Sequence, residues 1–190
     1  MFKKILIANR GEIAVRIIRA CRELGVKTVA VHSDVDFDAM HVKLADESVC
    51  IGKSNAASSY LNIPNILSAV NITGADAVHP GYGFLSESEK FAEILEKYDV
   101  KFIGPNSDSI LSLGNKNNAL KLAKKYNIPI LGSGEDSTIN NVKEAKDFAK
   151  KFKFPIVIKA SYGGGGRGMK VFNSYEEIDK HFSGLKIEAK

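Results

Sequence analysis

The sequence predicts an α/β protein, with a Rossmann-like doubly wound parallel sheet followed by an incomplete α+β unit. Over the first hundred residues, short apolar runs of β type alternate with amphipathic helical runs. This alternation is typical of parallel sheets with helical crossovers. After residue 105 it gives way to helices, and then to a glycine-rich stretch between two short strands.

The first unit begins with a strand, a helix and a second strand. "KILIA" predicts a buried strand, and "EIAVRIIRACRELG" predicts a helix that ends at Gly25, because glycine readily adopts the left-handed conformation of helix ends. "KTVAVHS" predicts the second strand, so the three elements form a βαβ unit with a right-handed crossover. The apolar face of the helix carries Ile13, Ile17, Cys21 and Leu24, beside Ala14 and Ile18, and the polar face carries Arg16, Arg19 and Glu23.

The alternation continues to residue 105. "SVCIG" predicts a strand, and "IPNILSAVNITG" predicts a helix with Pro64 in its first turn and Gly74 at its end. "DAVHPGYGFLSES" begins as a strand and becomes a loop at Pro80. "EKFAEILEKY" then predicts a helix and "VKFIGP" a strand. Residues 1–105 are therefore assigned to the Rossmann-like domain.

The rest of the chain has a different character. Residues 106–130 predict a helical linker of two short helices that meet near Gly114. Residues 131–190 predict the loop "LGSGEDST", the helix "NVKEAKDFAKKF", the strands "PIVIKAS" and "MKVFN" around the glycine stretch, and the helix "SYEEIDKHF". Two strands and two helices make a thin core, so we expect this unit to continue beyond the chain end.

The composition excludes several classes of protein. The 44% hydrophobic content is sufficient for a packed core, and the net charge of +5 comes from 27 basic and 22 acidic residues that are interleaved along the chain. Without a basic block, nucleic-acid binding is not expected. No apolar segment reaches membrane-spanning length, and the N-terminal apolar run is too short for a signal peptide. We expect a cytoplasmic protein with buried free thiols at Cys21 and Cys50.

The loop after the first strand argues against a dinucleotide. A dinucleotide-binding sheet carries G-x-G-x-x-G there, whereas "ANRGEIAV" has Gly11 alone. The glycines Gly163–Gly166 and Gly168 fit a phosphate better, because amides without neighbouring Cβ atoms can turn toward an anion. They lie between strands and lack the G-K-[ST] ending of a P-loop. They predict a β-hairpin flap over a triphosphate, the alternative being a flexible connector.

Two lysines are candidates for phosphate contacts. Lys159 lies on the strand before the glycines, on the face of Val157 and opposite Ile156 and Ile158. At the end of an apolar run it needs a partner such as a phosphate oxygen, although a solvated lysine is the alternative. Lys116 begins a helix, where the helix dipole disfavours a cation; taken alone it also fits an ordinary surface position.

The stretch "HPGYGFLSES" follows the carboxyl end of a strand, where open α/β sheets bind ligands. His79 fits a core histidine or a cap of a neighbouring loop. Tyr82 and Phe84 fit the walls of a site for a flat ligand, or a rigid turn packed by aromatic rings.

Across essentially its whole length the chain resembles the biotin carboxylase family. The resemblance is carried by "KILIANRGEIAVRIIRACRELG", "ADESVCIG", "SYLNIP", "HPGYGFLSE", "FIGP" and "KASYGGGGRGM", in this order. The family supplies the ATP-dependent component of acetyl-CoA carboxylase and the first domain of pyruvate carboxylase and its relatives. It belongs to the ATP-grasp superfamily, whose glycine-rich flap clamps a triphosphate.

The resemblance implies roles for matching residues. ATP-binding positions are Lys116, Lys159, Gly163, Gly164, Gly165, Gly166, Gly168 and Met169. Tyr82, Gly83 and Phe84 match the loop bordering the biotin site, and Arg19 and Glu23 match the family's dimer interface. Two positions depart from the family: Asn115 stands where Asp is common, and Tyr162 where a fifth glycine is common. We interpret both as tuning nucleotide affinity.

The resemblance implies ATP-dependent carboxylation of carrier-bound biotin by bicarbonate, through carboxyphosphate. The Mg²⁺ ligands, the adenine contacts, the general base and the arginines for bicarbonate and biotin are expected beyond residue 190. No catalytic or metal-binding residue is therefore assigned here, and this chain alone is expected to be inactive. The implied partners are a biotin carboxyl carrier protein or domain, a carboxyltransferase component and a second copy of the enzyme.

Two alternatives differ in testable ways. A different ATP-grasp ligase, of the purine or carbamoyl-phosphate type, would share the flap but would not respond to free biotin. A non-catalytic interaction module pairing through Arg19 and Glu23 would show no nucleotide effect on its stability.

Overall fold

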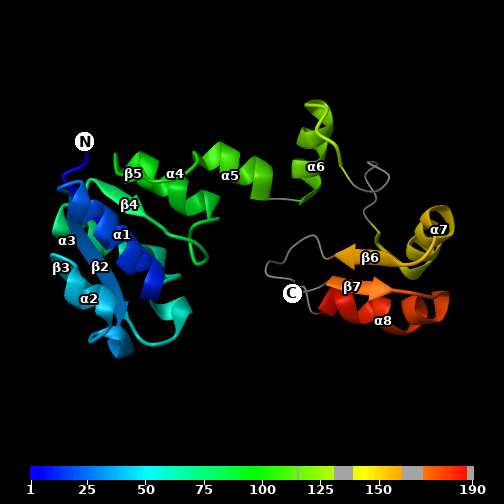
Figure 1. The fold of residues 1–190 in the computed structure, drawn as a ribbon. Coiled ribbons are helices and arrows are strands. Elements are labelled where there is room, and N and C mark those ends of the chain that lie inside the picture. The colour runs from blue at the N-terminus through cyan, green and yellow to red at the C-terminus, as the bar shows by residue number, and fades with distance from the viewer. Residues whose placement is uncertain (115, 131–138, 160–168, 188–190) are drawn as a thin grey trace. The chain divides into compact units, whose positions relative to one another are not determined.

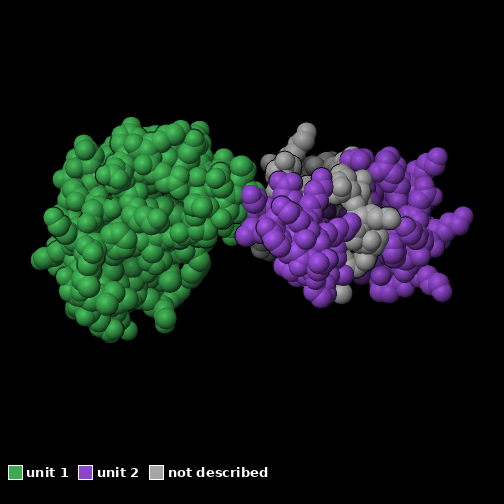
Figure 2. Space-filling model, turned by 90° about the horizontal axis from the view of Figure 1, so that it is seen from above, with its two compact units in different colours: residues 1–111 green, residues 112–190 purple. Residues whose placement is uncertain are grey.

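The computed structural model describes residues 1–114, 116–130, 139–159 and 169–187 (Figure 1). The chain divides into two compact units, residues 1–111 and 112–190 (Figure 2), and each is described by itself. The domain boundaries predicted at residues 105 and 130 stay predictions.

Unit 1 is built on a parallel five-stranded sheet in the order β3-β2-β1-β4-β5. The strands are β1 (Lys4–Ile7), β2 (Lys27–Ser33), β3 (Glu47–Gly52), β4 (Ala77–His79) and β5 (Lys101–Phe102). The chain winds outward from β1 to β3, returns to the centre and winds outward again from β4 to β5. The sheet is therefore doubly wound, as predicted, and its direction of winding switches between β1 and β4.

Successive residues of a strand point to opposite faces of the sheet, and in β1 they are apolar on both faces. Helices cover both faces of the sheet and bury these side chains. Unit 1 contains α1 (Gly11–Glu23), α2 (Met40–Leu44), α3 (Ile63–Thr73) and α4 (Glu89–Lys97), two short 3-10 turns (Asp34–Asp36 and Ala56–Ser58) and most of α5 (Ser107–Gly114). Ile5 and Ile7 pack with the apolar face of α1, whereas Leu6 packs with α3 and α4. The two cores are therefore separated by the sheet itself.

The predicted helix ends are confirmed. Gly25 and Gly74 both have positive φ, +68° and +64°, and Gly74 donates its N–H to the carbonyl of Val70 at 2.9 Å. The N-termini of α3 and α4 are capped by Asn62 and Ser88, whose side chains accept hydrogen bonds from backbone amides.

Two expectations about burial are wrong. Leu24 is 65% exposed because it stands at the C-cap of α1, beyond the last turn that packs on the sheet. Cys50 is also exposed, although Cys21 is buried as predicted. Cys50 lies on the edge strand β3, whose Val49 and Ile51 join the core on the opposite face. Residue periodicity does not show how far a covering helix extends across the sheet. The short helix α2 was not predicted either.

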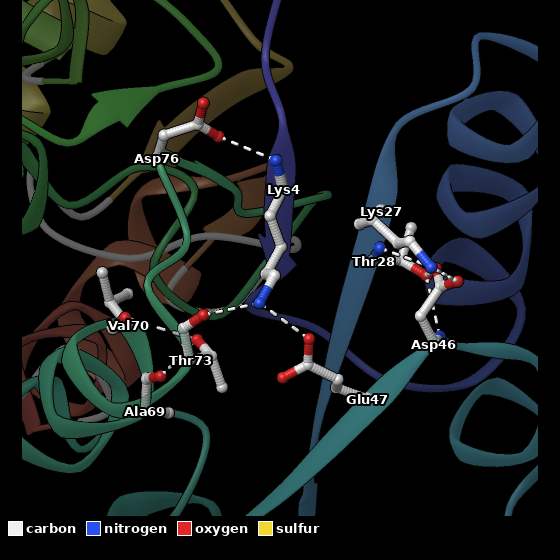
Figure 3. A network of polar contacts seen from close by, with 9 residues as sticks. All are labelled: Lys4, Lys27, Thr28, Asp46, Glu47, Ala69, Val70, Thr73 and Asp76. Carbon is white, nitrogen blue, oxygen red and sulfur yellow. Dashed lines mark hydrogen bonds and ion pairs between the residues drawn. The ribbon is translucent and has the colours of Figure 1, made fainter.

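Hydrogen bonds and an ion pair join the amino-terminal ends of the strands of the sheet (Figure 3). Asp76, just before β4, accepts hydrogen bonds from the amides of Lys3 and Lys4 at 2.8 and 3.0 Å. Asp46, just before β3, accepts hydrogen bonds from the amide and hydroxyl of Thr28, both at 2.9 Å. Lys4 Nζ lies 2.7 Å from a carboxylate oxygen of Glu47. These internal bonds join the starts of β1 and β4, of β2 and β3, and, through Lys4 and Glu47, of β1 and β3, at the ends of the strands opposite the predicted site.

Unit 2 contains a helix followed by an antiparallel hairpin with two further helices. Its elements are α6 (Lys116–Lys125), α7 (Val142–Phe152), β6 (Ile156–Lys159), β7 (Met169–Phe172) and α8 (Tyr175–Ile187). Ile156 and Phe172 are paired residues of the hairpin and pack with buried residues of α7 and α8. The predicted pair of strands is therefore confirmed, with one face covered by helices.

In the described ranges, no helix combines the length and the apolar character needed to cross a membrane.

Candidate functional site

One candidate site lies in unit 1, where the winding of the sheet switches direction. Strands β1 and β4 are neighbours, with Ile7 paired to His79, and Ala8 donates its amide to the carbonyl of His79 at 2.9 Å. The next residue, Asn9, is buried and donates its side-chain amide to the carbonyls of Pro80 and Tyr82, at 2.7 and 2.8 Å. The end of β1 therefore holds the loop after β4 at the edge where such sheets bind ligands.

The backbone of this loop needs its glycines. Gly81 and Gly83 both have φ of +65°, which L side chains rarely adopt. A Cβ on Gly81 would lie 2.8 Å from Asn9 Nδ2, so both conformation and space exclude a side chain there.

His79 holds the same turn from inside. Its Nδ1 accepts a hydrogen bond from the amide of Gly81 at 3.0 Å, which requires that nitrogen to be unprotonated. Burial lowers the pKa of the imidazole, so the neutral form is favoured. Of its two predicted roles, His79 has that of a loop cap.

The two aromatic residues of the loop differ in their surroundings. Tyr82 is 59% exposed and its hydroxyl donates to the carboxylate of Glu12 in the first turn of α1. Phe84 is 37% exposed and stacks on Tyr60, with ring centroids 5.1 Å apart and planes 18° apart. One ring is therefore largely open to solvent and the other is packed on one face. The packing of Phe84 agrees with the rigid-turn alternative, and a role of Tyr82 as the wall of a ligand site stays a prediction.

A polar cluster lies behind the stacked pair. The carboxylate of Asp36, only 10% exposed, accepts two hydrogen bonds from Arg10, at 2.8 and 2.5 Å. It also accepts the hydroxyls of Tyr60 and Ser33, at 2.7 and 3.0 Å. Hydrogen bonding by Arg10 holds the pKa of Asp36 far below its usual range. Burial, together with the hydrogen bond to Asp36, raises the pKa of Tyr60 to about 12.

Sequence reasoning missed the residues that hold this loop. Asn9 and Arg10 read as ordinary loop residues. Asp36 lies 26 positions from Arg10 and 24 positions from Tyr60. The one available signal was the polar pair "NR" directly after a buried strand, at the ligand edge of the sheet.

A separate candidate site is the open face of the hairpin in unit 2. Val157 and Val171 are paired across β6 and β7, and the next pair on the same face is Lys159 with Met169. The three apolar side chains are 48–50% exposed, and Lys159 is exposed as well. This face combines an apolar surface, suited to a flat ring, with a cation at the end of the strand that leads into the glycine stretch. Val157 and Val171 were not among the predicted site residues.

The remaining predicted site residues are the glycines of the flap, Lys116, Arg19 and Glu23. Gly163–Gly166, Gly168 and the departure at Tyr162 lie outside the described residues, as does Asn115. Lys116 is the first residue of α6, and its side chain lies outside the description. Arg19 and Glu23 are exposed on α1, one helical turn apart. Their roles stay predictions.

The described ranges contain no group of three His, Cys, Asp or Glu side chains that could hold a metal ion.

The chain matches two protein-family models. Residues 1–110 match the biotin carboxylase N-terminal domain, and residues 115–190 match the ATP-binding domain of the carbamoyl-phosphate synthase L chain. The first match covers more than half of the chain, and together the two leave four residues unmatched.

Individual relatives agree with these models. The chain is 52% identical over 190 residues to biotin carboxylase of Haemophilus influenzae, covering 100% of this chain and 42% of the relative. It is 50% identical over 188 residues to the mitochondrial propionyl-CoA carboxylase alpha chain of Rattus norvegicus, covering 99% of this chain and 25% of the relative. The sequence identity of this chain to a protein named biotin carboxylase, 52%, is therefore nearly the same as its identity to a longer carboxylase chain, 50%.

A solved structure shows the same fold. The biotin carboxylase domain of 2-oxoglutarate carboxylase from Hydrogenobacter thermophilus superposes with a TM-score of 0.93 at 43% identity, over 100% of this chain and 41% of that one. This chain spans about two fifths of the length of that domain and of the Haemophilus relative. The chain belongs to the biotin carboxylase family, whose N-terminal domain model covers its residues 1–110.

Proposed function

We propose that this chain is the N-terminal part of an ATP-dependent biotin carboxylase. In the proposed reaction, bicarbonate attacks the γ-phosphate of ATP to give carboxyphosphate and ADP. Carboxyphosphate breaks down to CO₂ and inorganic phosphate. N1′ of biotin, on a carrier protein or domain, loses its proton and attacks CO₂ to give carboxybiotin. The Hydrogenobacter relative was crystallised with MgADP, ADP and bicarbonate, which supports the nucleotide and the carboxyl donor.

One observation carries the nucleotide part of the proposal. The open face of the hairpin places Lys159 beside Met169, with Val157 and Val171 as the next pair. The apolar side chains suit the face of a flat base, and the ammonium group of Lys159 suits a phosphate oxygen. Phosphoryl transfer is mainly positioning and charge neutralisation, so a cation and glycine amides around a triphosphate are the groups this chemistry needs.

The remaining roles follow from the predicted residues. Gly163–Gly166 and Gly168 would donate amides to the triphosphate, and Lys116 would contribute a second cation. The loop with Tyr82, Gly83 and Phe84 would border the biotin site. Its place at the switch of the sheet supports this role.

The proposed assembly is a homodimer that uses the polar face of α1, with Arg19 and Glu23. It works with a biotin carrier and a carboxyltransferase component. The other groups that the reaction needs would come from a longer form of the protein, so this chain by itself would not turn over. The cytoplasmic location stays a prediction.

The test is ADP formation from Mg-ATP by the longest native form of the protein, with and without bicarbonate and free biotin. A biotin carboxylase needs both co-substrates for full turnover. A different ATP-grasp ligase, which the match of residues 115–190 leaves as second candidate, would form ADP without a response to biotin. Biotin-dependent turnover by the 190-residue chain alone would contradict its proposed incompleteness.

A further inference from the structure

The loop that carries Tyr82 has an uncommon backbone conformation at Phe84. Its φ is +41°, in a region that residues with a side chain seldom occupy. Such a conformation persists only where the surroundings hold it. Here Phe84 stacks on Tyr60, and the next residue, Leu85, is 6% exposed within the core. The amide of Ser86 donates to the carbonyl of Gly83 at 2.9 Å and closes the turn.

Tyr60 is itself fixed at its hydroxyl end. The residue is 2% exposed, its hydroxyl donates to Asp36 at 2.7 Å, and it accepts the amide of Ser33 at 3.1 Å. The hydroxyl end of the ring cannot move away without leaving a buried donor or acceptor unpaired. The position of the ring on which Phe84 rests is therefore held by the end of β2 and by Asp36.

Asp36 is fixed in turn by Arg10. The guanidinium gives two parallel hydrogen bonds to one carboxylate, an arrangement that determines direction as well as distance. Its Cζ also lies 5.9 Å from the centroid of the Tyr60 ring. A continuous series of contacts therefore runs from Arg10 through Asp36 and Tyr60 to Phe84. It ends at a loop whose aromatic rings stay partly open.

We propose that Tyr60, with Asp36 and Arg10 behind it, is a positioning residue for the Tyr82–Phe84 loop. By this contact it sets the affinity for the small planar ureido ring of biotin without touching the ligand. This inference rests on the proposed function. It predicts that a change at Tyr60 alters the KM for biotin and not the KM for ATP. The reason is that the loop belongs to unit 1, whereas the candidate nucleotide residues Lys159 and Met169 belong to unit 2.

The experiment uses steady-state kinetics of the longest native form with free biotin as the variable substrate. Tyr60→Leu removes the ring on which Phe84 rests, and an aromatic pair of this kind corresponds to a change of roughly threefold to tenfold. We expect KM for biotin to rise by that factor, with KM for ATP and the biotin-independent ATPase rate unchanged. Tyr60→Phe keeps the ring but loses the hydrogen bonds to Asp36 and Ser33, so KM for biotin is expected to rise by less than in Tyr60→Leu.

Two further variants separate positioning from loss of stability. Ile66→Val, on α3 in the same core, lowers stability and is expected to leave both KM values unchanged. Arg10→Lys keeps the charge but loses the two-bond contact with Asp36. Because the Arg10 side chain is half-exposed, this variant is expected to fold even if Tyr60→Leu does not. The KM for biotin should rise in Arg10→Lys as well.

Hydrogen exchange on this 190-residue chain gives a second readout. The amides of Gly81 and Ser86 are hydrogen-bonded within the loop, and both should exchange faster in Tyr60→Leu than in Ile66→Val. Equal changes in the two KM values, or no change in either, would overturn the inference while the proposed function stands. A wild-type enzyme that does not respond to biotin would overturn both.

Discussion

The side chain of Asn9 packs against the backbone of Gly81 at the point where the winding of the sheet changes direction. The side-chain amide of Asn9 donates to the carbonyls of Pro80 and Tyr82, on either side of Gly81, and a Cβ on Gly81 would lie 2.8 Å from its nitrogen. The end of β1 and the loop after β4 are therefore shaped against each other, and a side chain at position 81 would separate them.

Gly81→Ala is expected to lower the free energy of unfolding by about 1–3 kcal/mol, because it forces a side chain into a left-handed backbone and against Asn9. Urea denaturation of the 190-residue chain measures this change. Gly83→Ala is the matched control, since Gly83 has the same φ of +65° but no atom within 4 Å of its Cβ position. Equal losses in the two variants would show that the contact with Asn9 contributes nothing.

The stability of unit 1 is expected to fall in acid, in two stages. His41 is buried, with Nε2 3.3 Å from the carbonyl oxygen of Val31, and burial lowers its pKa, as it does for His79. The unfolded chain binds protons at these histidines first, so stability is lost as the pH falls below about 6.5. Asp36 affects stability at lower pH, because the hydrogen bonds from Arg10 depress its pKa in the folded state. Its contribution is present above about pH 4 and is lost below it.

Urea denaturation at pH 7.5, 6.0, 5.0, 4.0 and 3.0 tests both stages of this pH dependence. His79→Gln removes one of the two histidines and should reduce the loss of stability between pH 7.5 and 5.0. A wild-type stability that is constant across that range would contradict the neutral, buried state of both imidazoles.

Lys159→Met is expected to weaken nucleotide binding by roughly tenfold to a hundredfold, because a charged hydrogen bond contributes about 1.5–3 kcal/mol. Isothermal titration calorimetry with Mg-ADP on the longest native form measures this loss. Lys170→Met is the matched control, since Lys170 belongs to the same hairpin but is paired with Ile158 on the opposite face. If both variants bound Mg-ADP equally well, the open hairpin face would not be the nucleotide surface.

Arg19→Glu is expected to reduce self-association of the longest native form, because it places like charges on a polar face that the proposed dimer would share between two copies. Sedimentation velocity would show a shift from dimer toward monomer. Lys90→Glu makes the same change of charge on the exposed side of α4 and should leave the dimer intact. A dimer that is unaffected by Arg19→Glu would remove α1 from the interface.

The sequence predicts more of the fold than of the site. The alternation of strands and helices, Gly25 and Gly74 at helix ends and the alternating faces of β6 are local signals, and the structure confirms them. The exposure of Leu24 and Cys50 depends on where neighbouring helices end, which a single segment does not encode.

The contacts that hold the candidate loop are harder to predict because they join distant positions. Asn9 reaches Pro80 across 71 residues and Tyr60 reaches Asp36 across 24 residues. Neither residue type marks such a contact in advance, since Tyr60 reads as an apolar core residue. The folded sheet creates these contacts by bringing the ends of its strands together.

The proposed biotin carboxylase activity is tested most directly by ADP formation from Mg-ATP by the longest native form, with bicarbonate present and free biotin varied. We expect turnover that rises with biotin and saturates, and none from the 190-residue chain. ADP formation that is the same with and without biotin would contradict the proposed activity.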